Sequence, residues 1–197
     1  MNTPRLSLLA ISVMTINMAL AGGIPTLSTI EVTASADNLI GEANTATQGV
    51  VTAEQLSTRP LLRPAEVLEI VPGLIVTQHS GDGKANQYFL RGFNLDHGTD
   101  FATSIAGMPV NMTTHGHGQG YSDLNFMIPE LIETVQYRKG SYAAEDGDFA
   151  SAGAADIHYF WQLPQNIAEL TMGENSYYRG LVAGSQKLEN EIGRAHV

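Results

Sequence analysis

Four histidines in the middle of the chain are the side chains whose type and spacing could support chemistry. They lie in or beside polar, glycine-rich loops: His79, His97, His115 and His117. Neutral imidazole is a good ligand for zinc, copper and nickel ions, and nearby carboxylates offer oxygen ligands: Asp96, Asp100 and Asp123. His115 and His117 can reach one ion only if their loop curls, which the neighbouring glycines permit. The sequence therefore allows a metal site here, although a His-x-His pair without a third fixed ligand is a common pattern, and ordinary exposed loop residues are the alternative.

Motifs of enzyme catalysis are absent from the sequence. It contains no Gly-x-Ser-x-Gly nucleophile motif, no HExxH motif and no phosphate-binding loop. The Gly-Asp-Gly run at 81–83 is interpreted as a turn, because no helix is expected after it. The chain has no cysteine, which excludes thiol catalysis, disulfides and a thiolate zinc site. We therefore predict that the protein is not an enzyme.

The charge balance of the chain excludes two classes of partner. It carries 20 acidic residues against 10 lysines and arginines, a formal net charge of -10. Nucleic acids and anionic lipid surfaces both attract basic patches, so neither is expected as a partner. Hydrophobic residues make up 43% of the 197 residues, which is enough for a core, and the 20 glycines fit a loop-rich fold. One domain with an appendage is therefore expected.

The elements that must position the histidine loops are short strands and helices. Strands are predicted at 74–77, 87–90, 101–106 and 132–138, the last because apolar and polar side chains alternate along it. Helices are predicted at 52–57, which begins with a capping-box pattern, and at 64–71, with a single helical turn at 129–131. Strands with helices between them predict an α+β domain with a mixed sheet and short helices.

Several motifs follow one another along these elements. The Arg-Gly-Phe turn at 91–93 is followed by Gly-Met-Pro-Val-Asn at 107–111, by YSDLNFMIPELIETVQYRKG at 121–140, and by a small-residue strand at 150–157. In this order and spacing, the chain from Thr26 to His158 resembles the plug domain of TonB-dependent outer-membrane receptors. Ala154 and Ala155 depart from the family pattern, which more often has glycine and a β-branched residue there. The resemblance implies a globular plug domain at 51–158.

Some residues of these motifs are expected to have structural roles in the plug: Arg91, Gly92, Gly107, Pro129, Glu130 and Gly140. The glycines lie where strands turn sharply, and no chemistry is assigned to them. Arg91 follows an apolar strand and is expected to need a carboxylate, with Glu130 or Glu133 as candidates for an internal ion pair. Polar contacts between the plug and a barrel are the alternative.

In receptors of this family, outward-facing plug loops form the floor of the substrate site. The resemblance therefore predicts that His97, His115 and His117 contact a metal ion or a metal chelate. Simple exposure of these side chains, or hydrogen bonds to the barrel wall, are the alternatives. No resident cofactor is expected beyond such a transported metal ion or chelate.

The first 50 residues are predicted to be an export signal and a flexible arm. Arg5, the apolar run from Leu6 to Leu20 and the small-x-small sequence at 19–21 predict a cleaved signal peptide at 1–21, with an uncleaved anchor as the alternative. Residues 22–50 are polar and aperiodic, as in a flexible arm. One segment within them resembles the TonB box of the family, a strand that pairs with TonB: Thr29, Ile30, Glu31, Val32 and Thr33. An edge strand of the domain is the alternative.

Beyond the plug, residues 159–190 are predicted to form the first strands of a transmembrane β-barrel. Two alternating runs, 167–172 and 178–183, flank a turn and predict a hairpin. Because two strands are marginally stable alone, the chain is expected to be C-terminally truncated. Residues 191–197 are expected to derive from a sequencing adapter, since the codons ATC GGA AGA GCA CAC GTC fit 192–197 and match a common adapter read. A natural frayed end is the alternative.

Together these segments predict the N-terminal fragment of a TonB-dependent receptor for active uptake of a metal chelate or a similar scarce substrate. The expected location is the cell outer membrane, with the plug on the periplasmic side and inside the barrel; the fragment alone would be periplasmic. Its expected partners are TonB of the inner-membrane energy-transducing complex, the outer membrane through the missing barrel, and a small-molecule or metal substrate. The alternative is a free-standing periplasmic metal- or ligand-binding module with a plug fold and no channel.

Overall fold

The computed structural model describes residues 42–79 and 83–186 of the chain. Three sequence-based predictions lie outside these residues: the signal peptide at 1–21, the TonB-box-like segment from Thr29 to Thr33, and the adapter-like tail at 191–197. Within the two described segments, none of the helices combines the length and the apolar character needed to cross a lipid bilayer.

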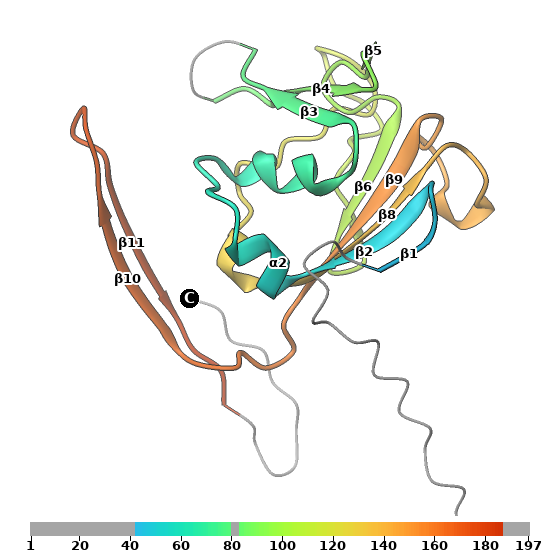
Figure 1. Ribbon diagram of the computed structural model, residues 1–197. Helices are drawn as coiled ribbons and strands as arrows, with labels where there is room; N and C mark the ends of the chain where they lie inside the picture. Colours follow the sequence, from blue (N-terminus) through green and yellow to red (C-terminus); the bar gives the residue numbers. More distant parts are fainter. Residues whose placement is uncertain (1–41, 80–82, 187–197) are drawn as a thin grey trace, which may run out of the picture. The chain divides into compact units, whose positions relative to one another are not determined.

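The largest element of the fold is a six-stranded mixed sheet with the strand order β1-β2-β8-β9-β6-β7 (Figure 1). Its strands are β1 (Glu42–Thr45), β2 (Gln48–Thr52), β6 (Phe101–Ile105), β7 (Met108–Pro109), β8 (Ile132–Lys139) and β9 (Gly153–Tyr159). The pair β6–β9 is parallel and the other neighbours are antiparallel. The predicted mixed sheet is therefore confirmed.

The sheet begins earlier in the sequence than the predicted plug boundary at residue 51. β1 and the first three residues of β2 lie within the segment 22–50 that was predicted to be a flexible arm, and β2 pairs with β8 from Gln48↔Arg138 to Thr52↔Thr134. The physical reason is tertiary contact: backbone pairing with β8 and burial of Gly49 and Val51 stabilise β2. The boundary is corrected to Glu42 for the described part of the chain.

A second, three-stranded sheet contains β3 (Leu74–Thr77), β4 (Gln87–Leu90) and β5 (Phe93–Asn94) in antiparallel order. Two-residue turns close β4–β5 at Arg91-Gly92 and β6–β7 at Ala106-Gly107, and all four turn residues have positive φ. Hairpin turns of this kind require positive φ at both central residues, and glycine adopts it without steric cost. Gly92 and Gly107 occupy turn positions that glycine adopts without strain, and Gly140 after β8 also has positive φ.

Short helices connect the strands: α2 (Ala53–Ser57) and the 3-10 helices η1 (Pro64–Ile70), η2 (Pro129–Leu131) and η3 (Ala144–Asp146). At the start of α2, the backbone N–H of Thr52 donates to Oε1 of Gln55 at 2.8 Å. Pro64 occupies the first turn of η1, and the Glu66 carboxylate accepts the backbone N–H groups of Leu62 and Arg63. The helices predicted at 52–57 and 64–71 and the turn at 129–131 are all present, although the second is a 3-10 helix.

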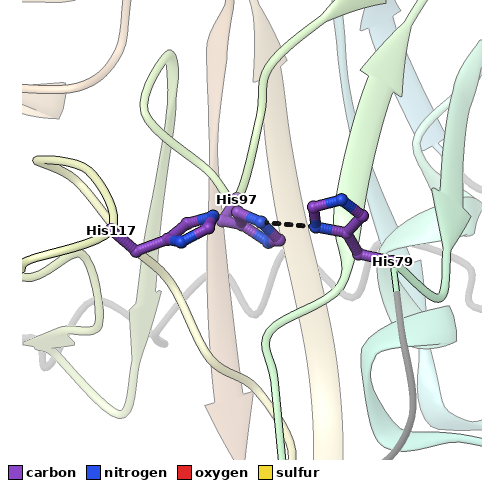
Figure 2. Close-up of side chains that lie close together, drawn as sticks. All are labelled: His79, His97 and His117. Carbon is purple, nitrogen blue, oxygen red and sulfur yellow. Dashed lines mark hydrogen bonds between the residues drawn. The ribbon is translucent and has the colours of Figure 1, made fainter.

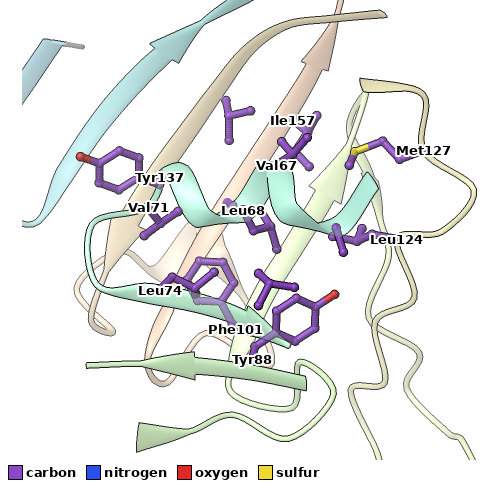
Figure 3. Close-up of a cluster of buried hydrophobic side chains, with 14 of the residues drawn as sticks. Val67, Leu68, Val71, Leu74, Tyr88, Phe101, Leu124, Met127, Tyr137 and Ile157 are labelled. Atoms are coloured by element: carbon purple, nitrogen blue, oxygen red, sulfur yellow. The ribbon is translucent and has the colours of Figure 1, made fainter. Parts of the chain in front are cut away.

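The hydrophobic core lies between η1 and the two sheets, where side chains from elements far apart in sequence meet (Figure 3). Leu68 of η1, Phe101 of β6, Val135 of β8 and Ile157 of β9 are each at most 1% exposed. Complete burial of such a side chain stabilises the fold by about 1.5–3 kcal/mol relative to leaving it in water. This core holds β3 and β4 through their buried side chains, and His79 follows β3 along the chain.

The C-terminal described segment forms the hairpin β10 (Ile167–Met172) and β11 (Tyr178–Ala183), with the residue bounds predicted from the sequence. Its strands pair antiparallel along their full length, from Ile167↔Ala183 to Met172↔Tyr178. A small second cluster of buried apolar side chains joins it to the 3-10 helix η2: Leu131, Leu163 and Ala183.

One predicted ion pair is corrected by the structure. Glu130 was a candidate partner of Arg91, but its two carboxylate oxygens accept hydrogen bonds from Arg179 of β11 at 2.7 and 2.8 Å. Arg91 is exposed in the β4–β5 turn. The turn directs Arg91 away from the core, whereas η2 and β11 bring Glu130 and Arg179 together.

Candidate functional site

Three of the four loop histidines converge on one place in the structure (Figure 2). One ring nitrogen from each of His79, His97 and His117 lies within 4.8 Å of the corresponding nitrogens of the other two. We refer to these three residues as the histidine cluster. His97 is buried, and His79 and His117 are exposed.

The three-stranded sheet explains why His79 and His97 meet. β3 and β5 both run antiparallel to β4, so the chain leaves β3 and β5 at the same end of the sheet. Pairing continues past β5, where the N–H of Tyr88 donates to the carbonyl of Asp96 and the N–H of Leu95 donates to that of Tyr88. Residues that follow Thr77 and Asn94 are therefore held on either side of the start of β4.

His97 is the fixed member of the cluster. Its side chain is 1% exposed, and its Nδ1 lies 3.0 Å from the backbone carbonyl oxygen of Asn86. Because a carbonyl can only accept, Nδ1 carries the proton and donates it. In the neutral ring the other nitrogen, Nε2, is the acceptor, and it lies 3.1 Å from Nδ1 of His79. A ring held by a backbone carbonyl on one nitrogen, with the other nitrogen free to coordinate, is the usual arrangement of a metal-binding histidine.

His117 reaches the cluster from the long loop between β7 and β8. Its ring lies 4.6 Å from the ring of His97, centroid to centroid, at 68°. Desolvation lowers the pKa of His117, as do the nearby charges of Lys84 and His97, although Asp96 has the opposite effect. The net result favours the neutral imidazole, which is the form that coordinates metal ions.

Backbone hydrogen bonds tie this loop to the strand ends. The N–H of Ser122 donates to the carbonyl of His97 at 2.8 Å. The hydroxyl of Tyr121 accepts the N–H of Ala85 at 2.8 Å in a buried position. These contacts hold the loop that carries His117 against the segments that carry His97 and the start of β4.

Asp96 places a carboxylate beside the cluster. Its Oδ1 lies 3.7 Å from Nε2 of His97, and its side chain is 49% exposed. The backbone of Asp96 has a positive φ of 51°, and its N–H donates to Oδ1 of Asn94 at 2.8 Å. A carboxylate oxygen therefore lies beside His97, the central member of the cluster.

The cluster differs from the predicted set of His97, His115 and His117. The ring of His115 instead stacks on Tyr121, with centroids 4.0 Å apart and planes at 14°, and its Nδ1 accepts the N–H of His117. His79 takes the third place. The signal for His79 was present in the sequence, because neighbouring antiparallel strands at 74–77 and 87–90 would bring the residue after the first strand close to those before the second.

The spacing within the cluster suits a single transition-metal ion. Two nitrogens bound to one tetrahedral zinc at about 2.0 Å lie about 3.3 Å apart. The nitrogens of His79 and His97 are 3.1 Å apart, so small adjustments would allow both to bind one ion. The exposed positions of His79 and His117 leave access from solvent.

Comparison with known proteins identifies relatives of the fold. A sequence model of the family described as TonB-dependent Receptor Plug Domain matches residues 42–154. A mutant of the ferric enterobactin receptor of Pseudomonas aeruginosa is similar in structure, with a TM-score of 0.52 and 18% identity, over 74% of this chain and 23% of that one. The copper transporter OprC matches with a TM-score of 0.51 and 19% identity, over 72% of this chain and 22% of its own. The chain thus spans less than a quarter of each of these two structures.

Proposed function

This chain belongs to the family of TonB-dependent receptor plug domains, and we propose from this premise that it is the N-terminal part of an outer-membrane receptor for active uptake of a metal ion or metal chelate. It is a receptor domain rather than an enzyme, as the sequence predicts. The α+β plug fold with its mixed sheet is likewise as predicted.

The observation that carries the metal part of this proposal is the histidine cluster. Three imidazoles from three separate loops gather within 4.8 Å on one surface of the plug fold. Exposed histidines distributed by chance would not share a buried central member held by a backbone carbonyl. Two of the similar structures are named for a ferric chelate and for copper, and a metal-containing cargo for this chain agrees with both.

The two faces of the hairpin support its assignment as the first part of a barrel wall. One face carries only apolar or small side chains, in three cross-strand pairs: Ala168↔Val182, Leu170↔Gly180 and Met172↔Tyr178. The other face carries the polar side chains of Glu169, Thr171 and Arg179 near the turn and the apolar ones of Ile167, Leu181 and Ala183 at the opposite end, where Ala183 and Ile167 pack in the cluster with Leu131. An apolar outer face and a polar inner face are the pattern of a transmembrane β-barrel strand.

The plug would gate such a barrel. Substrate binding at the histidine cluster, on the outer side, would release the segment from Thr29 to Thr33 to the periplasm. TonB would pair with that segment as an added strand and transmit the force that displaces the plug. The contact between Glu130 and Arg179 would be one of the polar contacts that hold the plug against the wall.

Uptake by cells that carry the complete gene tests this function. Accumulation of radioactive zinc, and of a ferric catecholate chelate, would be compared in hosts with and without TonB, and with a deletion of residues 29–33. We expect accumulation of at least one cargo that is lost in both cases. Accumulation independent of TonB, with the protein in the periplasmic fraction, would contradict the receptor and favour the free-standing periplasmic binding module.

A further inference from the structure

We propose that His79, His97 and His117, with Asp96 as an additional oxygen ligand, bind one uncomplexed divalent ion of the zinc class. The inference rests on the proposed receptor function only in naming this ion as the cargo, since the binding itself depends on the described side chains alone. Of the two cargo types in the proposed function, this inference names the free metal ion and not an intact metal chelate.

The arrangement of the three imidazoles favours binding of one metal ion. His97 is held in one orientation by Asn86, so its Nε2 is directed at the cluster before any ion arrives. His79 and His117 lie on either side of this ring, at centroid distances of 5.0 and 4.6 Å (Figure 2). Three protein nitrogens with one oxygen from Asp96 would make four ligands, the number of a tetrahedral zinc site.

The nitrogen ligands of the cluster favour an ion of the zinc class. Nitrogen ligands suit zinc, copper and nickel, whereas magnesium and calcium prefer a shell of oxygens. A chelate such as a ferric catecholate already surrounds its metal with oxygen atoms, so the imidazoles of the cluster could not reach the metal. The cluster is therefore suited to an ion with free coordination positions.

The charge beside the cluster favours a cation over an anionic chelate. Recognition of an anionic chelate relies on several arginines or lysines that converge on it. Among the described residues, the lysine and carboxylate whose charges affect the pKa of His117 are Lys84 and Asp96. Asp96 lies 3.7 Å from the central histidine nitrogen and would attract a cation and repel an anionic chelate.

An ion bound at the cluster would join three separate segments of the chain. His79 follows β3, His97 follows β5, and His117 lies between β7 and β8. An ion held by all three would cross-link these loops, and any ligand that binds only the folded state adds to its stability. Zinc should therefore raise the thermal unfolding temperature of the chain as well as bind to it.

Titration calorimetry of the 197-residue chain without a histidine tag tests the inference, with zinc chloride as the probe and magnesium chloride as a control ion. We expect one zinc ion per chain and no magnesium binding. His79→Gln and His117→Gln should each weaken zinc binding about 100-fold or more, since loss of a ligand exceeds the 10–100-fold typical of loss of a supporting hydrogen bond. Both side chains are exposed, so these variants should fold normally.

Two matched variants serve as controls: His115→Gln, from the same loop as His117, and His158→Gln, from β9. Both should bind zinc as the unmodified chain does. The inference is overturned if the unmodified chain binds no zinc, or if binding survives His79→Gln and His117→Gln. It is also overturned if His115→Gln removes binding and His79→Gln does not, because the predicted set of His97, His115 and His117 would then be the site.

The calorimetry and the uptake assay separate failure of this inference from failure of the proposed function. TonB-dependent uptake of the ferric chelate, with no zinc binding by the chain, would keep the receptor and remove the zinc site. Zinc binding at the cluster, with no TonB-dependent uptake of either cargo, would keep the site and remove the receptor function.

Discussion

The six-stranded sheet and the hairpin β10–β11 are built from similar alternating strands but bury their side chains differently. The sheet packs Phe101, Val135 and Ile157 against η1, and these side chains are at most 1% exposed. The hairpin leaves Leu170 and Val182 about 70% exposed while its Arg179 is paired with Glu130. The sheet therefore makes its own core, whereas the hairpin has the side-chain pattern of a wall that faces an apolar environment.

Truncation of a leucine should give the largest difference between the two regions in the free energy of unfolding. Leu68 of η1 is 1% exposed, so Leu68→Ala leaves a cavity and should lower the free energy of unfolding by about 2–5 kcal/mol. Leu170 of β10 is 69% exposed, and Leu170→Ala should change it by less than about 0.5 kcal/mol. Urea denaturation of both variants measures these values, and equal losses would mean that the hairpin packs in solution as tightly as the core.

Addition of a methyl group at a glycine in each region should give a smaller difference in the free energy of unfolding. In β9, a Cβ on Gly153 would lie 2.4 Å from the carbonyl oxygen of Arg138 in the neighbouring strand β8. Gly153→Ala should therefore lower the free energy of unfolding by about 1–3 kcal/mol. In β11, a Cβ on Gly180 would meet nothing within 4 Å, and Gly180→Ala should be neutral within about 0.5 kcal/mol. A neutral Gly153→Ala would show that β8 and β9 are not as close as described.

The smallest effect is expected where the two regions touch. Glu130→Gln removes the charge that pairs with Arg179, and a partly exposed ion pair contributes about 1 kcal/mol or less. The loss should appear as lower hydrogen-exchange protection of the β10 and β11 amides, with little change in the sheet. Glu133→Gln, on the exposed side of β8, is the matched control and should leave the protection of both regions unchanged.

The pH dependence of the hairpin follows from the same pair. Burial acts to raise the pKa of Glu130, but the hydrogen bonds from Arg179 and the backbone and the charge of Arg179 outweigh it, so the pKa lies below its usual value. The stabilisation is fully present above the pKa of an unfolded glutamate, about 4.3, and is lost as the pH falls through the lower folded pKa. Hairpin protection should therefore decrease below about pH 4 in the unmodified chain, and this step should be absent from Glu130→Gln.

The sequence predicts the bounds of a strand correctly where the local pattern of apolar residues matches the side chains that the fold buries. The bounds of β3, β4, β10 and β11 were predicted to the residue, because each is a short alternating or apolar run flanked by turn residues. Sequence reasoning missed β1 and β2: β2 is a strand through pairing with β8, some 85 positions later in the chain, and β1 pairs with β2. Tertiary pairing of this kind leaves no periodic signal in the segment itself.

The sequence named two of the three members of the histidine cluster, and their metal binding stays a prediction. The sequence indicated loop histidines as metal ligands, and His97 and His117 do lie together. Proximity in sequence favoured His115, but its ring stacks on Tyr121. His79, 18 positions before His97, joins the cluster because β3 and β5 end on the same side of the small sheet. Side-chain packing and strand topology, rather than spacing, decide which imidazoles meet.

The strand order of the large sheet also has a consequence for how the protein is made. Its two central strands, β8 and β9, are the last of the six to be synthesised, and β2 and β6 find no partner in the centre of the sheet until residues 132–159 have been added. Sheets that depend on such distant pairing fold slowly, and their unpaired edges are open to aggregation in the meantime. A nascent chain shorter than about 159 residues therefore cannot form this sheet, and chaperones that hold the chain unfolded would be most needed before that point.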